Sequence, residues 1–212
     1  FVRSGTAIGL GSGSTARFAT LRIAERLREG SLEKIVAVPT SEDTAALARA
    51  EGIPLTDLAT HPSLDVTIDG ADEVDPDRNL IKGLGGALLR EKIVAHATGR
   101  EIIVVDEGKL VTRLGTRSPV PVEVVRFGWQ NTLRALEATG ARCALRLTHG
   151  APYATDEGHL IVDCTYPGID DPRALEIQIN SIPGVVENGL FLGIAYAVVV
   201  ASAEGVRLIE RG

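Results

Sequence analysis

Over the first half of the chain, short apolar runs alternate with longer segments that carry helix signals. Short apolar runs bounded by turn residues are typical of buried strands. They predict strands at residues 6–10, 35–38, 64–69 and 101–105, and the segments between them predict helices that end near residues 29, 52 and 98. Strands that alternate with helices indicate an α/β fold with a parallel, doubly wound sheet.

The pattern changes in the second half of the chain. Strands are predicted at residues 120–125, 142–148, 160–165 and 185–187, and helices at 129–139 and 172–181. This βαββαβ order is that of a ferredoxin-like α+β arrangement. The apolar runs at 194–200 and 206–209 are predicted to return to the first sheet. We therefore expect two domains, one formed by residues 1–118 plus 190–212 and a smaller one formed by residues 119–189.

Two polar segments carry signals of a helix start. In Gly11-Ser-Gly13-Ser-Thr-Ala16, Ser14 or Thr15 is expected to cap the next helix, and residues 40–43 fit a capping box. The glycine loop fits G-x-G-x-x-A, whose N–H groups hold a phosphate, although an ordinary strand–helix turn has the same pattern. A dinucleotide site also needs an acid after the second strand, where this chain has Pro39-Thr40-Ser41. The loop therefore favours a single phosphate.

Composition and charge argue against several classes of protein. The 212 residues are 44% hydrophobic and 24% charged, which is enough apolar material for a buried core. A net charge of −6 argues against a nucleic-acid surface, and no apolar run approaches the roughly 20 residues that span a membrane. No secretory signal is visible, and Cys143 and Cys164 lack metal-binding spacing. A pair of reduced thiols in the cytoplasm is the simplest interpretation.

The sequence predicts no metal site. Asp75-x-Asp77-x-Asn79 begins like a calcium loop, but Leu80 stands where that loop needs glycine and Gly86 where it needs glutamate. The four histidines lack the spacing of metal ligands, and we interpret them as surface or structural residues: His61, His96, His149 and His159.

The segment from Asp69 to Lys92 holds the residues with the richest chemistry. The predicted strand ends at Asp69, and Asp72 and Glu73 follow it. Lys82, a glycine loop and Glu91 come next. Taken singly, the acids are also explained as turn or capping residues, and Lys82 with Glu91 as a surface charge pair. Together, at the carboxyl end of a parallel strand, they favour a site that moves a proton on a small anionic substrate.

These segments resemble the type A ribose-5-phosphate isomerases. The matching pieces are Gly9-Leu-Gly-Ser-Gly-Ser-Thr15, Pro39-Thr40-Ser41, Asp69-Gly-Ala-Asp-Glu73, Lys82-Gly-Leu-Gly-Gly86, Arg90-Glu91-Lys92 and Pro183-Gly-Val-Val-Glu-Asn-Gly-Leu-Phe191. The resemblance covers nearly the whole chain in order. It implies that the larger domain is Rossmann-like and catalytic and that the smaller, ferredoxin-like one is a lid or oligomerisation domain. It also implies a homodimer or homotetramer.

The resemblance implies interconversion of D-ribose 5-phosphate and D-ribulose 5-phosphate through an enediolate, in the non-oxidative pentose phosphate pathway, without metal or cofactor. Glu91 is then the general base, and Lys82 lies beside the developing oxyanion. Asp69 and Asp72 hold sugar hydroxyls, and one of them helps to open the ring. The implied substrate contacts are Ser12, Gly13, Ser14, Thr15, Asp69, Gly70, Ala71, Asp72, Lys82, Gly83, Leu84, Gly85 and Lys109.

Two other functions fit parts of the pattern. A sugar-phosphate-sensing domain of similar fold would lack the catalytic acid and carry a DNA-binding module, whereas Glu91 is present and no helix-turn-helix signal is visible. An NAD-dependent dehydrogenase is disfavoured by Pro39-Thr40-Ser41. Family members usually have a helix with a basic residue before the first strand, where this chain begins. We therefore expect either a truncated N-terminus or weaker phosphate binding.

Overall fold

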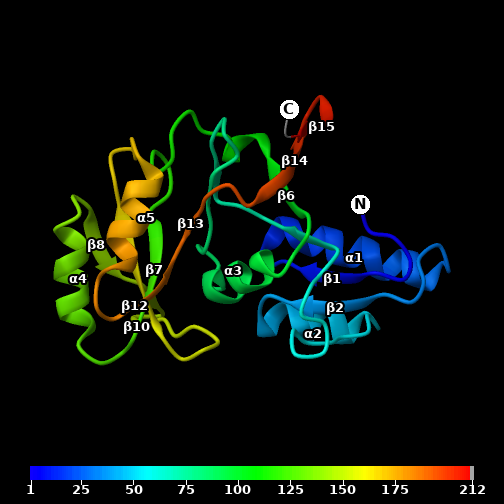
Figure 1. The fold of residues 1–212 in the computed structure, drawn as a ribbon. Coiled ribbons are helices and arrows are strands. Elements are labelled where there is room, and N and C mark those ends of the chain that lie inside the picture. The colour runs from blue at the N-terminus through cyan, green and yellow to red at the C-terminus, as the bar shows by residue number, and fades with distance from the viewer. Residues whose placement is uncertain (211–212) are drawn as a thin grey trace. The chain divides into compact units, whose positions relative to one another are not determined.

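The computed structural model describes residues 1–210 and divides into two compact units (Figure 1). Unit 1 comprises Phe1–Gly70, Arg90–Gly108 and Ile194–Gly212, and unit 2 comprises Ala71–Leu89 and Lys109–Gly193. Residues 119–189, predicted as the smaller domain, fall within unit 2, which extends beyond them on both sides. The predicted domain bounds stay a prediction, because compactness alone does not show that a segment folds by itself.

Unit 1 is built on a six-stranded sheet in the order β15-β14-β6-β3-β1-β2. Its strands are β1 (Ala7–Leu10), β2 (Val36–Pro39), β3 (Val66–Asp69), β6 (Glu101–Asp106), β14 (Ala195–Ser202) and β15 (Gly205–Glu210). Neighbouring strands are parallel except β14 and β15. The predicted mostly parallel sheet is confirmed, and so is the return of the last two strands to it.

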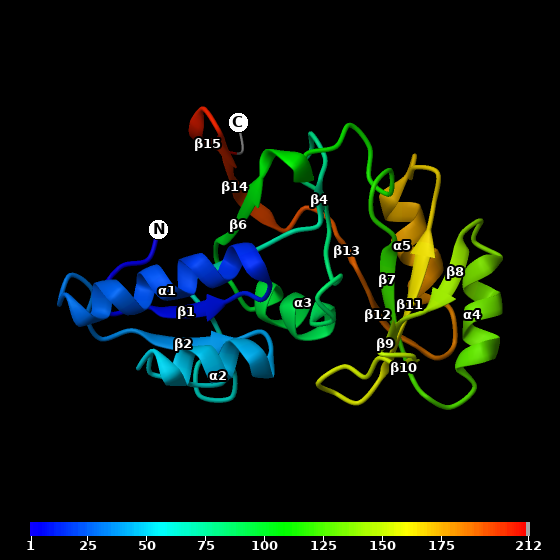
Figure 2. The same ribbon diagram turned by 180° about the vertical axis from the view of Figure 1, so that it is seen from behind.

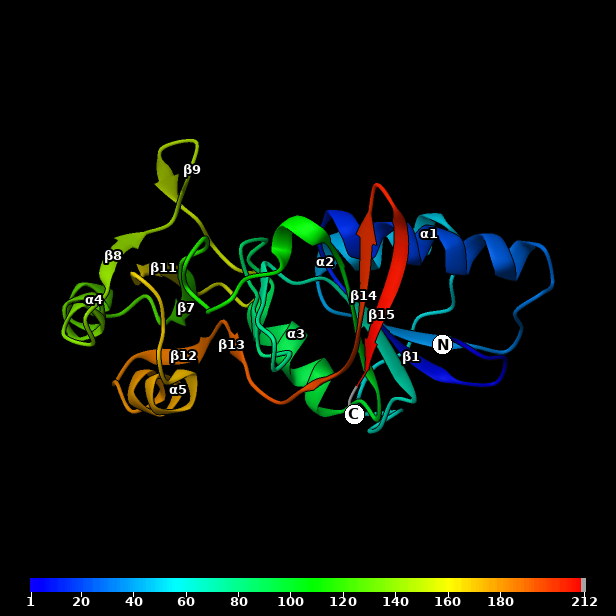
Figure 3. The same cartoon turned by 90° about the horizontal axis from the view of Figure 1, so that it is seen from above.

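Helices cover both faces of this sheet. They are α1 (Ser14–Arg28), α2 (Glu42–Ala50) and α3 (Leu88–His96). Ala37 of β2 belongs to the core that α1 and α2 form, whereas its neighbour Val38 packs with Val94 of α3. Because successive side chains of a strand point to opposite faces, α1 and α2 share one face and α3 covers the other; Figure 3 shows α1 and α2 on the same side. The sheet is therefore doubly wound, as predicted.

The predicted helix caps are wrong. α1 follows Gly13, which has a φ of 93° and makes no side-chain cap, so Ser14 and Thr15 already lie in the first turn. A positive φ costs glycine little, and this explains why glycine rather than a hydroxyl residue precedes the helix. In α2 the capping residue is Ser41 rather than Thr40, and its Oγ accepts the Thr44 N–H at 3.1 Å.

Unit 2 contains the predicted ferredoxin-like arrangement. The antiparallel sheet has the order β12-β7-β11-β8, with β7 (Val120–Val124), β8 (Arg142–Leu145), β11 (Leu160–Thr165) and β12 (Val185–Asn188). The helices are α4 (Trp129–Glu137) and α5 (Pro172–Asn180), which lie against the sheet in Figure 2. Leu136 of α4 and Ile179 of α5 are buried in one core with Val122 and Val162, so both helices cover the same face. No helix within residues 1–210 is long and apolar enough to cross a membrane.

Several short strands of unit 2 were not predicted. β4 (Glu73–Val74), β5 (Leu80–Ile81) and β13 (Leu190–Phe191) form a three-stranded sheet. The predicted strand 142–148 is interrupted at Arg146, because β9 (Leu147–Thr148) leaves β8 to pair with β10 (Ala151–Pro152). Strands of two residues are too short for an alternating pattern to indicate them.

Glu73 is the last of the three acids in Asp69-Gly-Ala-Asp-Glu73, and it has a structural role within unit 2. Its side chain is fully buried, and its carboxylate accepts the N–H groups of Gly115 at 2.7 Å, Arg117 at 2.7 Å and Ser118 at 2.5 Å. Three backbone donors satisfy the buried charge and fix the loop at residues 115–118.

We expect Glu73→Gln to lower the free energy of unfolding by about 2–5 kcal/mol, because a neutral amide cannot replace three charge-assisted hydrogen bonds. Urea denaturation measures the change. Glu137→Gln, at the exposed end of α4, is the control and should change stability by less than about 0.5 kcal/mol. Equal stability of the two variants would contradict the structural role of Glu73.

Candidate active site

The predicted phosphate loop meets Asp69 at the carboxyl ends of β1 and β3. From β1 the chain continues through α1 to β2 on one side, while β3 lies on the other, so this edge is a topological switch point. Ligands of open α/β sheets bind at such points. The side chain of Asp69 is buried, with 1% exposed, and its Oδ1 accepts the N–H groups of Ser12 at 3.1 Å and Gly70 at 2.7 Å. The loop after β1 thus fixes the orientation of this acid.

Two glycines allow β1 and β3 to approach this closely. A Cβ atom on Gly9 would lie 2.0 Å from Thr67 Oγ1, and one on Gly11 would lie 2.2 Å from Asp69 Oδ1 and 2.4 Å from its Cα. Real Cβ contacts are never so short, so a side chain at either position would push the strands apart. Part of the glycine pattern predicted as a phosphate loop therefore serves strand packing.

A cluster of hydroxyls surrounds Ser12. Its Oγ lies 2.8 Å from Thr40 Oγ1, 2.7 Å from Ser41 Oγ and 3.2 Å from Thr44 Oγ1. Thr44 also donates to the Gly11 carbonyl at 3.2 Å. The sequence indicated Thr40 and Ser41 as part of a capping box and of the family pattern, but it gave no sign of Thr44. These hydroxyls bond to one another and to backbone carbonyls, so they tie the end of β2 to the loop after β1.

The start of α1 presents the remaining features of an anion site. Gly13 and Ser14 are exposed, Thr15 is half-buried, and no acidic residue lies in the first turn. The N–H groups of a first turn lack partners within the helix, and the helix dipole favours negative charge there. The predicted phosphate contacts thus lie where the physics of the helix favours them.

Glu91 lies in the first turn of α3. Its side chain is buried, with 6% exposed. The neighbouring Arg90 forms an ion pair with Glu42, at 2.8 Å, which ties the start of α3 to the start of α2. Glu91 is therefore a buried acid on an anchored helix, and a solvated surface residue is excluded.

Unit 2 carries the other acid and the lysine. Asp72 accepts the Leu84 N–H on Oδ2 at 3.0 Å. Lys82 directly follows β5; its N–H donates to the Gly189 carbonyl at 2.9 Å, and its Nζ lies 5.5 Å from the centre of the Phe191 ring. Its side chain is 2% exposed, so the ammonium is buried against an aromatic face, which attracts cations. Lys82 and Glu91 are not the surface charge pair considered from the sequence.

The structure thus assembles the predicted residues in two sets. In unit 1, Ser12 contacts Asp69 and Gly70. In unit 2, Asp72 contacts the loop that begins at Lys82. Lys109 ends the short 3-10 helix η1 (Glu107–Lys109) and is half-buried. The chain passes between the units at positions 70/71, 89/90, 108/109 and 193/194, and the first three of these lie within two residues of a predicted site residue.

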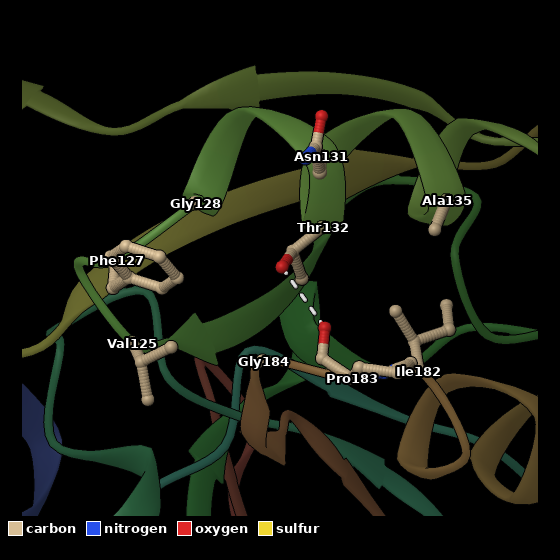
Figure 4. Close-up of a pocket in the computed structure, with 9 residues that line it drawn as sticks. All are labelled: Val125, Phe127, Gly128, Asn131, Thr132, Ala135, Ile182, Pro183 and Gly184. Carbon is tan, nitrogen blue, oxygen red and sulfur yellow. Dashed lines mark hydrogen bonds between the residues drawn. The ribbon is translucent and has the colours of Figure 1, made fainter.

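A pocket of about 410 Å³ lies elsewhere in unit 2 (Figure 4). One of its few polar groups, the Thr132 hydroxyl, donates to the Pro183 carbonyl at 3.0 Å. The lining residues include no titratable side chain: Val125, Phe127, Gly128, Asn131, Thr132, Ala135, Ile182, Pro183 and Gly184. The pocket therefore offers no group that could act as an acid or a base.

Glu123 is a buried acid of unit 2 that the sequence did not indicate. Burial raises the pKa of its carboxyl, and hydrogen bonds from His159 and Thr155, both at 2.9 Å, oppose that rise. His159 thus has a structural partner, in keeping with its predicted role. Across residues 1–210, no group of three or more His, Cys, Asp or Glu side chains is arranged to hold a metal ion.

Fold and residues together define an α/β protein with a glycine loop and a buried acid, Asp69, at the carboxyl ends of two parallel strands. The model of the ribose 5-phosphate isomerase A (phosphoriboisomerase A) family matches residues 36–205, and the chain belongs to this family. Ribose-5-phosphate isomerase A of Roseiflexus castenholzii is 56% identical over 211 residues, which cover 99% of this chain and 90% of that protein. The Gloeobacter violaceus protein is 55% identical over 209 residues, 98% of this chain and 90% of that protein.

Solved structures of the family share the fold. A D-ribose-5-phosphate isomerase in complex with phospho-erythronic acid has a TM-score of 0.97 and 44% identity, covering 100% of this chain and 93% of that one. The ribose 5-phosphate isomerase of Plasmodium falciparum has a TM-score of 0.96 and 39% identity, covering 99% of this chain and 92% of that one.

We expect Gly11→Ala to destabilise the protein by about 1–3 kcal/mol, because the added methyl group overlaps with Asp69. Gly99→Ala is a matched control, since its Cβ would meet only the carbonyl oxygens of Asp65 and Leu64, both at 3.6 Å. Thermal or urea unfolding of the two variants measures the difference. A tolerated Gly11→Ala would show that β1 and β3 need no glycine at their contact.

Proposed function

We propose that this chain interconverts D-ribose 5-phosphate and D-ribulose 5-phosphate. The observation that carries the proposal is that a member of this isomerase family keeps Glu91 as a buried acid on an anchored helix. A related structure is described as a complex with phospho-erythronic acid, whose carboxylate spreads negative charge over two oxygens, as an enediolate does. That likeness supports a reaction through an enediolate.

In the proposed mechanism Glu91 removes the proton from C2 of the open-chain aldose and returns it to C1 of the enediolate, while the hydroxyl proton passes from O2 to O1. One carboxylate can do both, because the two carbons are adjacent. The Lys82 ammonium stabilises the oxyanion that develops meanwhile, and its burial strengthens that interaction. Asp69 and Asp72 hold sugar hydroxyls, and one of them assists ring opening. The family pattern supports these roles, and so does the burial of Asp69, Lys82 and Glu91.

The phosphate is proposed to bind at the start of α1, at residues 12–15, with Lys109 as a further contact. The N–H groups of the first helical turn, which has no acidic residue, support this part of the proposal. A phosphate held away from the reacting carbons provides binding energy that positions the substrate. Residues 70–71 and 83–85 are proposed as further substrate contacts.

We further propose that the chain forms a homodimer or homotetramer and works in the cytoplasm. The first proposal rests on the family pattern alone, and light scattering distinguishes the two assemblies. The second is supported by the free thiols of Cys143 and Cys164, since cytoplasmic proteins keep their cysteines reduced.

Ketose formation from ribose 5-phosphate, measured with and without EDTA, tests the function. We expect turnover that EDTA leaves unchanged, because the proposed chemistry needs only side chains. Binding of ribose 5-phosphate without turnover would favour the sugar-phosphate-sensing alternative. Loss of activity on chelation, restored by a divalent ion, would contradict the metal-independent mechanism.

Glu91→Gln should lower kcat by roughly 10²–10⁴, because the amide keeps the shape of the side chain but cannot accept the proton. Binding of ribose 5-phosphate should persist, since the proposed phosphate and hydroxyl contacts are made by other residues. Glu33→Gln, at an exposed glutamate of unit 1, is the control and should leave kcat unchanged. Full activity of a folded Glu91→Gln protein would exclude Glu91 as the base.

A further inference from the structure

Arg146 is held firmly at the break between β8 and β9. Its N–H donates to the Ile161 carbonyl at 2.8 Å, and its own carbonyl accepts the Tyr153 N–H at 2.9 Å. Its Nε donates to Asp163 Oδ2 at 2.9 Å, and Nη2 pairs with Oδ1 of the same carboxylate. The side chain is 12% exposed. Both the backbone and one edge of the guanidinium are therefore fixed within unit 2.

The remaining edge of this guanidinium binds the glycine loop after Lys82. Nη1 carries two hydrogens, and it donates to the Gly83 carbonyl at 2.8 Å and to the Leu84 carbonyl at 3.0 Å. Only arginine combines a fork for a carboxylate with further donors in the same plane. Arg146 therefore links Asp163 of the antiparallel sheet to two consecutive carbonyls of the loop.

These bonds hold one peptide group from both ends. In a planar trans peptide, the C=O of Gly83 and the N–H of Leu84 point in opposite directions. The carbonyl is bound by Arg146, and the N–H donates to Asp72 Oδ2 at 3.0 Å. The guanidinium thereby helps to set the position of Asp72 without touching it.

Tyr153 extends the same contact. Its hydroxyl donates to the Gly85 carbonyl at 3.4 Å, and its ring lies 5.9 Å from the guanidinium carbon of Arg146. A Cβ atom on Gly86 would lie 2.1 Å from the Tyr153 hydroxyl oxygen. Arg146 and Tyr153 thus donate hydrogen bonds to three consecutive carbonyls of the loop, at residues 83–85.

We propose that Arg146 is a positioning residue of the isomerase reaction. Glycines at positions 83, 85 and 86 remove the steric barrier to turning the peptide groups of this loop over, so hydrogen bonds must hold them; besides Arg146, the Gly86 N–H donates to the Gly83 carbonyl at 3.0 Å. A carbonyl oxygen turned towards the substrate would repel the oxyanion beside Lys82, whereas N–H groups stabilise it. By binding the carbonyls of Gly83 and Leu84, Arg146 keeps the N–H edge of the loop on the side of Asp72. This proposal rests on the proposed function.

The test compares Arg146→Ala and Arg146→Lys with Arg113→Ala. Arg113 is a matched control, because it also bonds to a carboxylate, Asp170 at 2.6 Å, and to a carbonyl, Pro167 at 3.3 Å, but not to the loop. We expect both Arg146 variants to lose roughly 10- to 100-fold in kcat, the scale of a misplaced catalytic group, with KM changed by less than about threefold. Arg113→Ala should keep the wild-type kcat.

Hydrogen exchange of the amides at residues 84–86 is the second measurement. It should be faster in the Arg146 variants and unchanged in Arg113→Ala. Arg146→Lys keeps the charge without the fork, so it tests the positioning role even where Arg146→Ala does not fold. Wild-type kcat in a folded Arg146 variant, or an equal loss in Arg113→Ala, would overturn the proposal. If the wild-type protein does not isomerise ribose 5-phosphate, the proposed function fails. Unchanged hydrogen exchange at residues 84–86 in the Arg146 variants would instead show that Arg146 does not hold the loop.

Discussion

The contact between β1 and β3 is the constraint on which the candidate site depends. Gly9 and Gly11 have no side chains, so the end of β1 can lie directly against Asp69 at the end of β3. The same closeness lets the Ser12 N–H reach the Asp69 carboxylate and starts α1 with its N–H groups at the edge of the sheet. Strand packing, orientation of an acid and a helix N-terminus suited to an anion therefore have one physical origin.

Buried charges are the second feature of this protein, and their partners distinguish their roles. The Glu73 carboxylate accepts hydrogen bonds from three backbone N–H groups, so its role is structural. Lys82 is buried against an aromatic ring, and Asp69 accepts two backbone N–H groups on Oδ1. Burial of such groups is costly, and proteins keep them where that cost is offset by hydrogen bonds or by function. A short sequence such as Asp69-Gly-Ala-Asp-Glu73 thus contains acids with different roles.

Much of the fold could be predicted because the alternation of apolar runs and helical segments is a local property of the sequence. The doubly wound sheet, the ferredoxin-like order and the return of the last two strands follow from it. The partners of the site residues could not be predicted, because they depend on contacts between distant segments. Arg146 lies 63 positions from Gly83, and nothing in its neighbourhood distinguishes it from a strand residue. Thr44, in contact with Ser12, was missed for the same reason.

The division of the chain into interleaved units has a consequence for its synthesis. Unit 2 ends at Gly193, so all of its residues have been made before β14, which pairs with β6 inside the sheet of unit 1. Until then β6 presents an unpaired edge, and such edges are prone to join other chains. All of unit 2 has therefore been synthesised while the sheet of unit 1 still lacks β14 and β15. In a growing chain, the edge of β6 therefore stays unpaired from its own synthesis until β14 has been made.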